Sequence, residues 1–580
     1  MPSSQPGALP AWPEAAQRED WEAEPERRVA YMAGRGESIG FLEAYSIGVG
    51  GMIGGGIFAV LGLSLELAGY AAPIAFLISG LVALLTAYSY AKLSVRFPSE
   101  GGTVEFLVRG FGDGLLAGGL NVLLLVSYTV MIALYSYAFG SYAAAALGEP
   151  WLRGLFSALV IAAFVVINAL GAVVSGRVED ALVLFKVAVL VIVAGAGASL
   201  VDWSRFSPSN WPPFTSIVAG GMIIFLAYEG FELIANASAD VEDPSILPKA
   251  FYASVLTVIA VYVGVALVSA GVLPLDKIQI YRDYALAEAA KPSLGEAGFI
   301  LVTLAALAST SSAINATLYG TAGISYVVAK YGQLPPRVGR SIWGRATEGL
   351  VLIAAISLLL VETVRLEAIS TAGSGGFLIV FTAVNLAAYR LRRAAKVNPL
   401  LALAGAAATS FSLLILSFRM LEKSPGSLEL LALLVAGSFA AEALYRRLKR
   451  RRLAEYIDEK LRLREENIRR WEEWLPRLAA EARRVLRDAE VYLVGGVARG
   501  ELESSHDVDV LIVTRSKPRT RREERELKRE LKRRAGLTKL HPVDIHFAAP
   551  EEKEKWLRHS RASKKIEPKA ATGDTAQPRS

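Results

Sequence analysis

The stretch GVGGMIGGGIFAVLG (residues 48–62) lies within an apolar run that extends from about residue 40 to residue 66. The run is long enough to cross a bilayer, which requires about 20 apolar residues, yet each glycine costs a helix about 1 kcal/mol relative to alanine. Glycines spaced by four would indicate close packing against another helix. Three consecutive glycines at 54–56 point to all sides of a helix and favour an unwound segment. Such a segment is tolerated in a membrane only where protein encloses it, so the stretch predicts an enclosed cavity.

The composition of the chain is that of a multi-pass membrane protein. Of its 580 residues, 53% are hydrophobic, and the mean hydropathy is +0.38. Twelve apolar runs, of which the ninth is the shortest, are each about long enough for one crossing. These runs occupy residues 40–66, 70–95, 115–147, 153–175, 180–201, 214–238, 249–273, 297–329, 347–362, 366–389, 399–418 and 428–446.

The distribution of charge predicts the orientation of the chain. Lysine and arginine are concentrated before the first run, after the second, eighth and tenth runs, and after the twelfth, as in RRLKRRR (446–452). The positive-inside rule then places both termini in the cytoplasm of a protein of the cell membrane, in contact with lipid. Residues 1–37 are polar, lack the segments of a signal peptide and are typical of a disordered cytoplasmic tail.

The sixth apolar run carries a second interruption. The segment IVAGGMIIFLAYEGFELIANASADVEDP (217–244) places two carboxylates, Glu229 and Glu232, beside Gly230 in an otherwise apolar helix. The first and sixth runs each begin a set of five. Interrupted helices at equivalent places of two halves indicate a transporter that is built from inverted repeats.

Three motifs resemble those of the amino acid–polyamine–organocation (APC) superfamily: GVGGMIGGGIF, RFPSEGGTVEFL (96–107) and FLAYEGFELIANASADVEDPSILPKAF (225–251). The resemblance covers about residues 38–447. It implies an all-α membrane protein of twelve transmembrane helices, with a five-plus-five inverted repeat, broken helices 1 and 6, and alternating access around a site at the membrane midplane. It also implies an amino acid or a related amine as the small-molecule substrate.

The resemblance implies a particular substrate site. The α-carboxylate would lie against the amides of the first break, and the α-ammonium would meet backbone carbonyls of both breaks, while side-chain selectivity would come from the sixth helix. We expect Glu232 to brace its break, and Glu229 either to recognise a cationic substrate or to carry a proton. The implied substrate-binding residues are Gly51, Met52, Gly54, Gly55, Gly56, Leu226, Ala227, Tyr228 and Glu229.

Proton chemistry in the membrane must use carboxylates, lysine or tyrosine, because the chain has no cysteine and its four histidines all follow the last run. Lys186 lies in the fifth run, where it could snorkel to the interface. The resemblance instead implies that its ammonium occupies the place where sodium-coupled relatives hold an ion, which would make the carrier proton-coupled or an exchanger. Ser311 and Ser312 in the eighth run would bind sodium if Lys186 pointed elsewhere.

The composition changes after residue 447. Residues 448–488 are predicted to form a charged amphipathic helical linker, broken by Pro476, that docks on another surface or lies along the inner leaflet. The segment VYLVGGVARGELESSHDVDVLIV (491–513) predicts a strand, a glycine turn, a short helix and a second strand. Asp507 and Asp509 alternate on the second strand and share a face, and PVDIHFA (542–548) adds Asp544 on a third.

Three converging carboxylates suit Mg²⁺, and the glycine turn lets backbone approach a phosphate, which together indicate two-metal nucleotidyl transfer. Residues 489–550 resemble the minimal nucleotidyltransferase family. The resemblance implies that Gly495 and Gly496 hold a nucleoside triphosphate and that Asp507, Asp509 and Asp544 are catalytic and bind the metal. Many members have serine at the position of Gly496, so a fold that binds a nucleotide without turning it over is the rival.

Residues 551–580 are expected to be basic and largely disordered, and the acids interleaved in 515–539 argue against nucleic acid as a partner. The sequence thus predicts a secondary active transporter of an amino acid with a cytoplasmic nucleotide-binding, regulatory domain. The alternative is a membrane-anchored nucleotidyltransferase whose carrier domain acts as an amino acid sensor. A homodimer is left open.

Overall fold

The computed structural model describes residues 39–99, 101–170, 176–241, 243–330, 333, 341–343, 346–498, 500, 508–518, 521–537, 541, 543–560 and 562–567. The chain divides into two compact units, with the boundary between Arg446 and Arg447. The predicted tail at 1–37 and the predicted metal ligand Asp507 lie outside the described residues.

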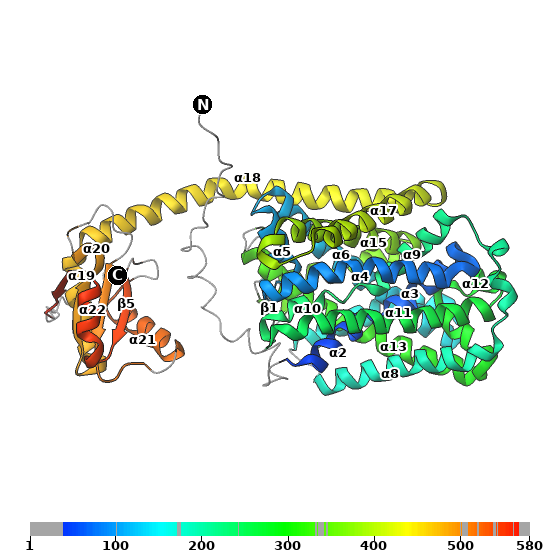
Figure 1. Ribbon diagram of the computed structural model, residues 1–580, viewed down its shortest axis with the longest axis horizontal. Helices are drawn as coiled ribbons and strands as arrows, with labels where there is room; N and C mark the ends of the chain where they lie inside the picture. Colours follow the sequence, from blue (N-terminus) through cyan, green and yellow to red (C-terminus); the bar gives the residue numbers. More distant parts are fainter. Residues whose placement is uncertain are drawn as a thin grey trace, which may run out of the picture. The chain divides into compact units, whose positions relative to one another are not determined.

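The first unit is a bundle of helices, many of which run nearly parallel to one another (Figure 1). Its helices are α2 (Phe41–Met52), α3 (Gly56–Ala68), α4 (Ala72–Arg96), α5 (Thr103–Phe111), α6 (Leu115–Leu147), α7 (Arg153–Ala169), α8 (Gly176–Gly197), α9 (Phe214–Tyr228), α10 (Leu233–Asn236), α11 (Leu247–Val272), α12 (Leu275–Ile280), α13 (Ala285–Lys330), α14 (Glu348–Thr363), α15 (Leu366–Arg390), α16 (Arg392–Ala395), α17 (Pro399–Lys423) and the first part of α18 (Pro425–Arg469), which crosses the boundary between the units. Two short strands, β1 (Ser341–Trp343) and β2 (Ala346–Thr347), pair between α13 and α14.

Each of the twelve predicted apolar runs contains at least one helix. Among the described residues, ten helical stretches are long and apolar enough to cross a membrane, and one of them, Gly56–Arg96, holds both α3 and α4. The short ninth run corresponds to α14, whose segment Gly349–Thr363 is a shorter apolar helix. The first and sixth runs are both broken, as predicted: Ile53–Gly55 separate α2 from α3, and residues 229–232 separate α9 from α10.

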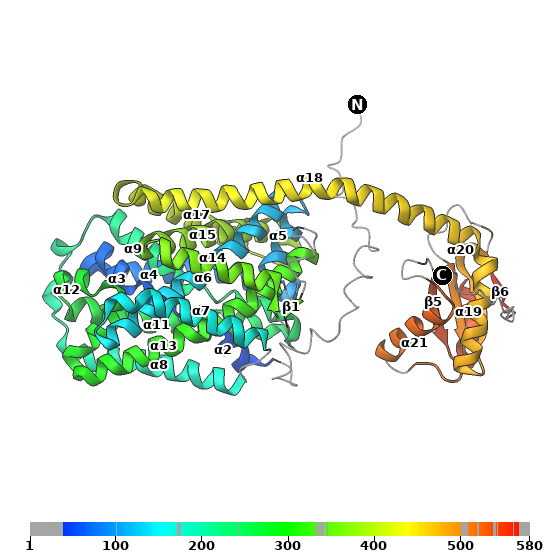
Figure 2. The same ribbon diagram turned by 180° about the vertical axis from the view of Figure 1, so that it is seen from behind.

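The contacts between helices define two groups, whose members are labelled in Figures 1 and 2. The broken helices α2/α3 and α9/α10 pack with α4 and α11, whereas α6, α7, α13 and α14 pack with one another. The helix α8 contacts members of both groups, α11 and α13. The two breaks therefore lie in one group and face residues of the other.

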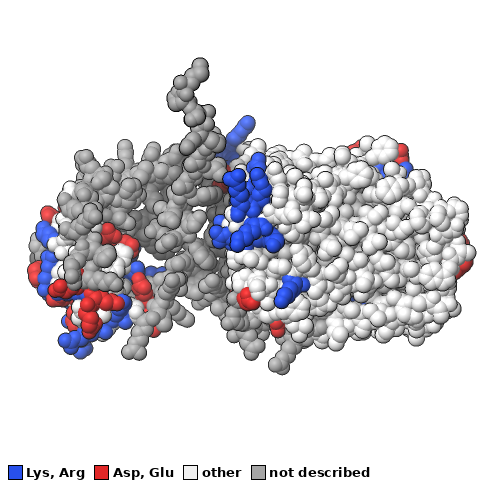
Figure 3. Space-filling model, in the orientation of Figure 1, with Lys and Arg blue, Asp and Glu red and all other residues white. Residues whose placement is uncertain are grey.

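The surface of the bundle fits a lipid environment. Large apolar side chains such as Leu184, Leu414 and Leu433 are exposed on its helices. Figure 3 shows a face on which most of the surface carries no charged side chain, with lysine and arginine gathered at the end of the bundle where α5 lies. Side chains that are apolar along the middle and basic at one end are typical of a membrane-embedded protein.

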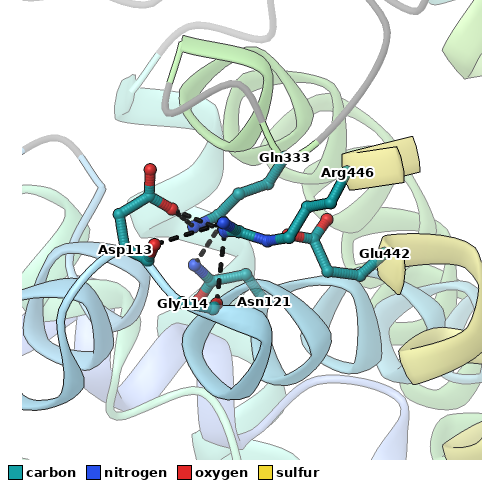
Figure 4. A network of polar contacts seen from close by, with 6 residues as sticks. All are labelled: Asp113, Gly114, Asn121, Gln333, Glu442 and Arg446. Carbon is teal, nitrogen blue, oxygen red and sulfur yellow. Dashed lines mark hydrogen bonds and ion pairs between the residues drawn. The ribbon is translucent and has the colours of Figure 1, made fainter. Parts of the chain in front are cut away.

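A polar network holds α18 against the bundle near the end of its membrane-spanning part (Figure 4). The guanidinium of Arg446 donates to Asp113 Oδ1 at 2.7 Å and to the Gly114 carbonyl at 3.2 Å, and it pairs with the fully buried Glu442 at 2.5 Å. Gln333, which follows α13, donates to Asp113 Oδ1 at 3.1 Å and accepts from Asn121 at 2.7 Å. The network therefore joins α6, α18 and the segment after α13.

The second unit is a small α/β fold around a four-stranded sheet. Its strands lie in the order β5-β4-β3-β6, with β4 and β5 parallel and the other pairs antiparallel. The strands are β3 (Glu490–Val494), β4 (Val508–Val513), β5 (Val543–Ala548) and β6 (Ser563–Lys565), and the helices are α19 (Trp471–Leu486), α20 (Gly495–Ala498), α21 (Arg521–Arg534) and α22 (Lys553–His559). The strands β3 and β4 and the short helix α20, which begins at the two glycines, agree with the prediction for 491–513, while residues 499 and 501–507 lie outside the described residues.

The prediction that Pro476 breaks the linker helix is wrong. Helix α18 continues from the membrane part to Arg469, and Pro476 lies inside α19. The proline leaves the carbonyl of Glu472 without its helical partner, but Glu472 is exposed, so water can reach it. Trp474, Leu475 and Leu478 are buried in the core beneath the sheet and stabilise the helix, so α19 belongs to the second unit.

The sheet also extends beyond residue 550, where the sequence analysis expects a largely disordered tail. Strand β6 pairs with β3, and α22 precedes it. Glu490 on β3 accepts from Lys553 of α22 at 2.6 Å and from Lys565 of β6 at 3.1 Å. Hydrogen bonds from Lys553, Tyr492 and Lys565 lower the pKa of Glu490 to about 2, so both segments are attached to a carboxylate that stays ionised.

Candidate functional site

The two broken helices touch at their breaks through glycine. A Cβ atom on Gly56 would lie 2.7 Å from Cα of Ala227, and a Cβ atom on Gly230 would lie 2.4 Å from the carbonyl carbon of Gly51. Gly230 has φ +119°, which side-chain-bearing residues rarely adopt. The backbone of the first break can therefore approach that of the sixth helix only because these positions lack side chains.

The amides of the first break lie under an aromatic ring. Helix α3 begins at Gly56, and the first amides of a helix have no intrahelical partner. Tyr135 of α6 lies against this point, since a Cβ atom on Gly55 would lie 2.3 Å from its ring, and its hydroxyl lies 3.9 Å from the Cβ position of Gly54. Gly54, Gly55 and Gly56 are all buried, so the predicted carboxylate site is enclosed at the interface of the two helix groups.

Two hydroxyl groups contact the carbonyls at the breaks. The Tyr262 hydroxyl of α11 lies 2.7 Å from the Met52 carbonyl and 3.2 Å from the Ala227 carbonyl, at the ends of α2 and α9. Ser309 of α13 lies 2.8 Å from the Gly54 carbonyl and 3.2 Å from the Ile53 carbonyl. The sequence analysis named neither residue. A carbonyl oxygen has two lone pairs, so Met52 and Ala227 can still accept from a substrate ammonium.

The carboxylates of the sixth helix differ in their contacts. Glu232 is fully buried and accepts from the Gly230 amide at 2.7 Å and from the Tyr128 hydroxyl at 3.1 Å, which is the bracing role expected of it. Glu229 is 4% exposed, and its Oε2 has no hydrogen-bond partner among the described residues. The two carboxyl groups also lie within hydrogen-bonding range of each other, and Oε2 of Glu229 is the carboxyl oxygen of this pair that has no partner among the described residues.

Lys186 lies inside the bundle and not at the lipid interface. Its side chain on α8 is 2% exposed, and Nζ donates to the Gly50 carbonyl of α2 at 3.3 Å. Val183, one turn earlier, packs where a Cβ atom on Gly50 would lie. The snorkelling alternative is thus wrong, and the ammonium lies against the helix that carries the first break.

The remaining sequence-predicted residues of this site are placed as follows. Leu226 is buried and packs towards Gly373 of α15, and the Tyr228 hydroxyl donates to the Phe76 carbonyl at 3.0 Å. Ser311 and Ser312 are half-buried on α13, the helix that supplies Ser309 to the first break. Of these serines, Ser309 is thus the one for which the structure gives a contact with the break.

A polar cavity of about 400 Å³ lies near the far end of α3 and is separate from the glycine contacts. Arg282 in its wall pairs with Glu66 of α3 at 3.4 Å and with Asp283 at 3.3 Å, and Arg153 lies 4.2 Å from the centre of the Tyr137 ring. Tyr137 lies two residues after Tyr135 on α6, so this one helix contributes to the wall of the cavity and to the enclosed site. Its lining residues are Tyr137, Arg153, Arg282, Glu362, Thr363, Val364, Arg365, Leu366 and Glu367.

In the second unit, strand register brings together three of the predicted phosphate and metal residues, Gly495, Asp509 and Asp544. Asp509 on β4 is opposite Asp544 on the parallel strand β5 and opposite Val494, the last residue of β3. Gly495 follows at once with φ +75°, and a Cβ atom there would lie 2.1 Å from Oδ2 of Asp509. Glycine at 495, the first residue of α20, therefore leaves room for the Asp509 carboxylate at the end of β3.

These residues fit a divalent metal ion. Oxygens of Asp509 and Asp544 and a nitrogen of His546 lie within 4.8 Å of one another, and carboxylate oxygens are the ligands that Mg²⁺ prefers. His546 Nε2 lies 3.5 Å from each carboxylate, and its hydrogen bond to Asp509 raises the pKa of the imidazole. The sequence analysis missed His546, although its place two residues after Asp544 puts both on one face of the strand.

A membrane-embedded bundle whose two broken helices face a second helix group defines the first unit as a membrane transporter. Residues 39–430 match the amino acid permease family, and the chain belongs to this family, which confirms the resemblance to the APC superfamily. Residues 475–568 match the nucleotidyltransferase domain family.

Several characterised and uncharacterised proteins are similar to the first unit. The chain is 36% identical to the protein MJ0609 of Methanocaldococcus jannaschii, over 62% of this chain and 83% of that protein. It is 34% identical to the inner membrane transport protein YbaT of Escherichia coli, over 61% of this chain and 84% of that protein. It is 29% identical to the chloroplastic cationic amino acid transporter 9 of Arabidopsis thaliana, over 54% of this chain and 59% of that protein.

Proposed function

We propose that the protein moves an amino acid across the cell membrane by alternating access, with both termini in the cytoplasm. The observation that carries this proposal is the enclosed contact of two broken helices. The amides at the start of α3 suit an α-carboxylate, and the carbonyls at the ends of α2 and α9 suit an α-ammonium. The substrate would thus bind where the two helix groups meet, and a movement of one group against the other would open the site to either side.

Transport is coupled to protons, or proceeds by exchange, through Lys186. The buried ammonium against the Gly50 carbonyl supports this role, because a fixed positive charge there can take the place of a sodium ion. A lysine in a desolvated site can also release its proton during the transport cycle, which an arginine cannot. The polar cavity lined by Tyr137 and Arg282 would give the substrate an entry towards the site along α6, the helix that also carries Tyr135.

Glu229 gives the carrier its preference for amino acids with a cationic side chain. The unpartnered Oε2 in the enclosed site supports this assignment, as does the relative that is named a cationic amino acid transporter. We expect Glu229→Gln to reduce uptake of lysine or arginine by about tenfold or more, since a hydrogen bond to a charged group contributes about 1.5–3 kcal/mol. Uptake of a neutral amino acid should change little, and Glu105→Gln, outside both breaks, is the control.

Measuring uptake of both substrate classes by the two variants decides this point. Equal losses for neutral and cationic amino acids, together with loss of the response to a pH gradient, would instead make Glu229 a proton carrier. That result would contradict the specificity role of Glu229 and leave the proposal of amino acid transport in place.

We further propose that the second unit binds a nucleoside triphosphate and a divalent metal ion and thereby regulates the carrier. Gly495 and Gly496 would face the phosphates, and Asp507, Asp509 and Asp544 would hold the metal. When bound, the metal supplies charge neutralisation to the phosphates. Asp509 and Asp544 are paired across the neighbouring strands β4 and β5, and Gly495 lies beside Asp509. This arrangement supports the proposal.

We expect Asp509→Asn with Asp544→Asn to abolish metal-dependent ATP binding by the full-length protein, because two ligand charges are lost. Uptake without nucleotide should persist, since both residues belong to the second unit. Glu551→Gln, an exposed acid of the same unit, is the control. Isothermal titration with ATP and Mg²⁺ measures binding, and ATP binding that survives in the double variant would refute the assignment of these carboxylates.

A further inference from the structure

The second unit brings an imidazole into the carboxylate pair that the nucleotidyltransferase motif supplies. His546 Nε2 lies 3.5 Å from Oδ1 of Asp509 and 3.5 Å from Oδ2 of Asp544. All three side chains are at least partly exposed, so the cluster is open to an ion from solution. The ring of Trp556 on α22 lies 5.3 Å from the imidazole, centre to centre, and orients it from one side.

The distances from the imidazole nitrogen to the two carboxylates fit a shared ion. Ligands about 2.1 Å from one metal lie about 3.0 Å apart in an octahedron and about 3.4 Å apart in a tetrahedron. The separations of 3.5 Å between Nε2 and each carboxylate oxygen are close to the tetrahedral value. Small movements of three partly exposed side chains would complete such a geometry.

We propose that His546, Asp509 and Asp544 form a mixed imidazole–carboxylate site that binds a divalent transition-metal ion, such as Mn²⁺ or Zn²⁺, in preference to Mg²⁺. Imidazole is a good ligand for transition ions, whereas Mg²⁺ takes oxygen ligands and gives up water reluctantly. The inference rests on the proposed metal and nucleotide function of this unit and names the class of ion that the site selects.

Lys528 of α21 is the cation that competes for this site. Its Nζ lies 3.9 Å from Oδ1 of Asp544 and is held at 2.9 Å by Glu524. An ion that binds to Asp544 must therefore approach a positive charge, and removal of that charge should strengthen binding. Lys528→Gln should therefore strengthen metal binding, whereas the loss of a ligand should weaken it.

The test is titration of the purified full-length protein with Mn²⁺ and no nucleotide, followed by an electron spin echo experiment that detects nitrogen bound to the ion. The wild type should bind Mn²⁺ with nitrogen modulation, and an excess of Mg²⁺ should leave the signal in place. His546→Gln should weaken Mn²⁺ binding by about tenfold or more, since even outer partners of a metal site contribute that much. Lys528→Gln should tighten it, and Glu551→Gln should match the wild type.

His546→Asp keeps a metal ligand at this position. It therefore separates the loss of the imidazole from a general loss of folding. It should retain Mn²⁺ without nitrogen modulation and should bind Mg²⁺ better than the wild type does. Mn²⁺ bound by the wild type without nitrogen modulation, or displaced readily by Mg²⁺, would overturn the inference. Mn²⁺ binding that survives Asp509→Asn unchanged would also overturn it. ATP binding with Mg²⁺ that is present in the wild type and lost in the Asp509→Asn, Asp544→Asn variant would, after either result, leave the proposed function standing.

Discussion

Gly56→Ala is expected to reduce amino acid uptake by about tenfold or more, the largest effect that we expect from one methyl group. The new Cβ atom would lie 2.7 Å from Cα of Ala227, which is backbone and cannot rotate away. Overpacking of this kind costs about 1–3 kcal/mol and is relieved by separating the two chains. Separation would displace the amides at the start of α3 from the carbonyls at the end of α9, and the substrate would lose simultaneous contact with both.

Gly437→Ala is the matched control for this change. It places the same methyl group on α18, where a Cβ atom meets nothing within 4 Å. Initial uptake rates in proteoliposomes measure function, and thermal unfolding of the purified variants shows whether both remain folded. A folded Gly56→Ala protein that transports as fast as the wild type would mean that the contact with Ala227 is not part of the site.

Lys186→Met should lower accumulation driven by a proton gradient by about tenfold or more. Methionine keeps much of the apolar volume of the lysine stem but removes the ammonium from the Gly50 carbonyl. Loss of a charged hydrogen bond corresponds to about 1.5–3 kcal/mol, or roughly a tenfold to hundredfold loss in rate. Uptake with and without an inward proton gradient measures the effect, and Lys277→Met, at an exposed position on α12, is the control.

Lys186→Arg separates the charge of this residue from its proton. Arginine keeps the positive charge but does not release a proton in proteins. We therefore expect this variant to exchange internal for external substrate while failing to respond to the proton gradient. Full proton-driven accumulation by Lys186→Met would show that the buried ammonium has no part in coupling.

Much of the membrane unit could be predicted because its sequence departs from ordinary helices at informative places. The run of glycines at 54–56 and the acids beside Gly230 predicted both breaks, since glycine and buried charge are costly in a membrane helix. The position of Lys186 in the fifth run is compatible with both the lipid interface and the interior of the bundle. The packing of α8 against α2 places the side chain in the interior.

The hydroxyl groups at the breaks could not be predicted in the same way. Tyr262 lies 210 residues from Met52, and its acceptors are backbone carbonyls, which carry no sequence signature. Ser309 resembles its neighbours Ser311 and Ser312 in type, so the choice among them depends on the rotation of α13 about its axis. Such contacts depend on packing between distant segments.

The second unit shows two further limits of sequence analysis. Pro476 predicts a break in the helix, although the burial of Leu475 and Leu478 against the sheet outweighs the lost hydrogen bond. The short strand β6 is exposed and charged, so no apolar alternation marked it. The two-residue period that predicts Asp507 and Asp509 on one face of the second strand also predicts Asp544 and His546 on one face of the third strand.

The most direct test of the central claim is uptake of a panel of radiolabelled amino acids into proteoliposomes that contain the wild-type protein, with imposed proton or sodium gradients. The account predicts that an inward proton gradient drives uptake without sodium and that amino acids with cationic side chains are preferred. Absence of uptake for every amino acid under both gradients would contradict the account and favour a membrane-anchored nucleotidyltransferase whose bundle senses amino acids.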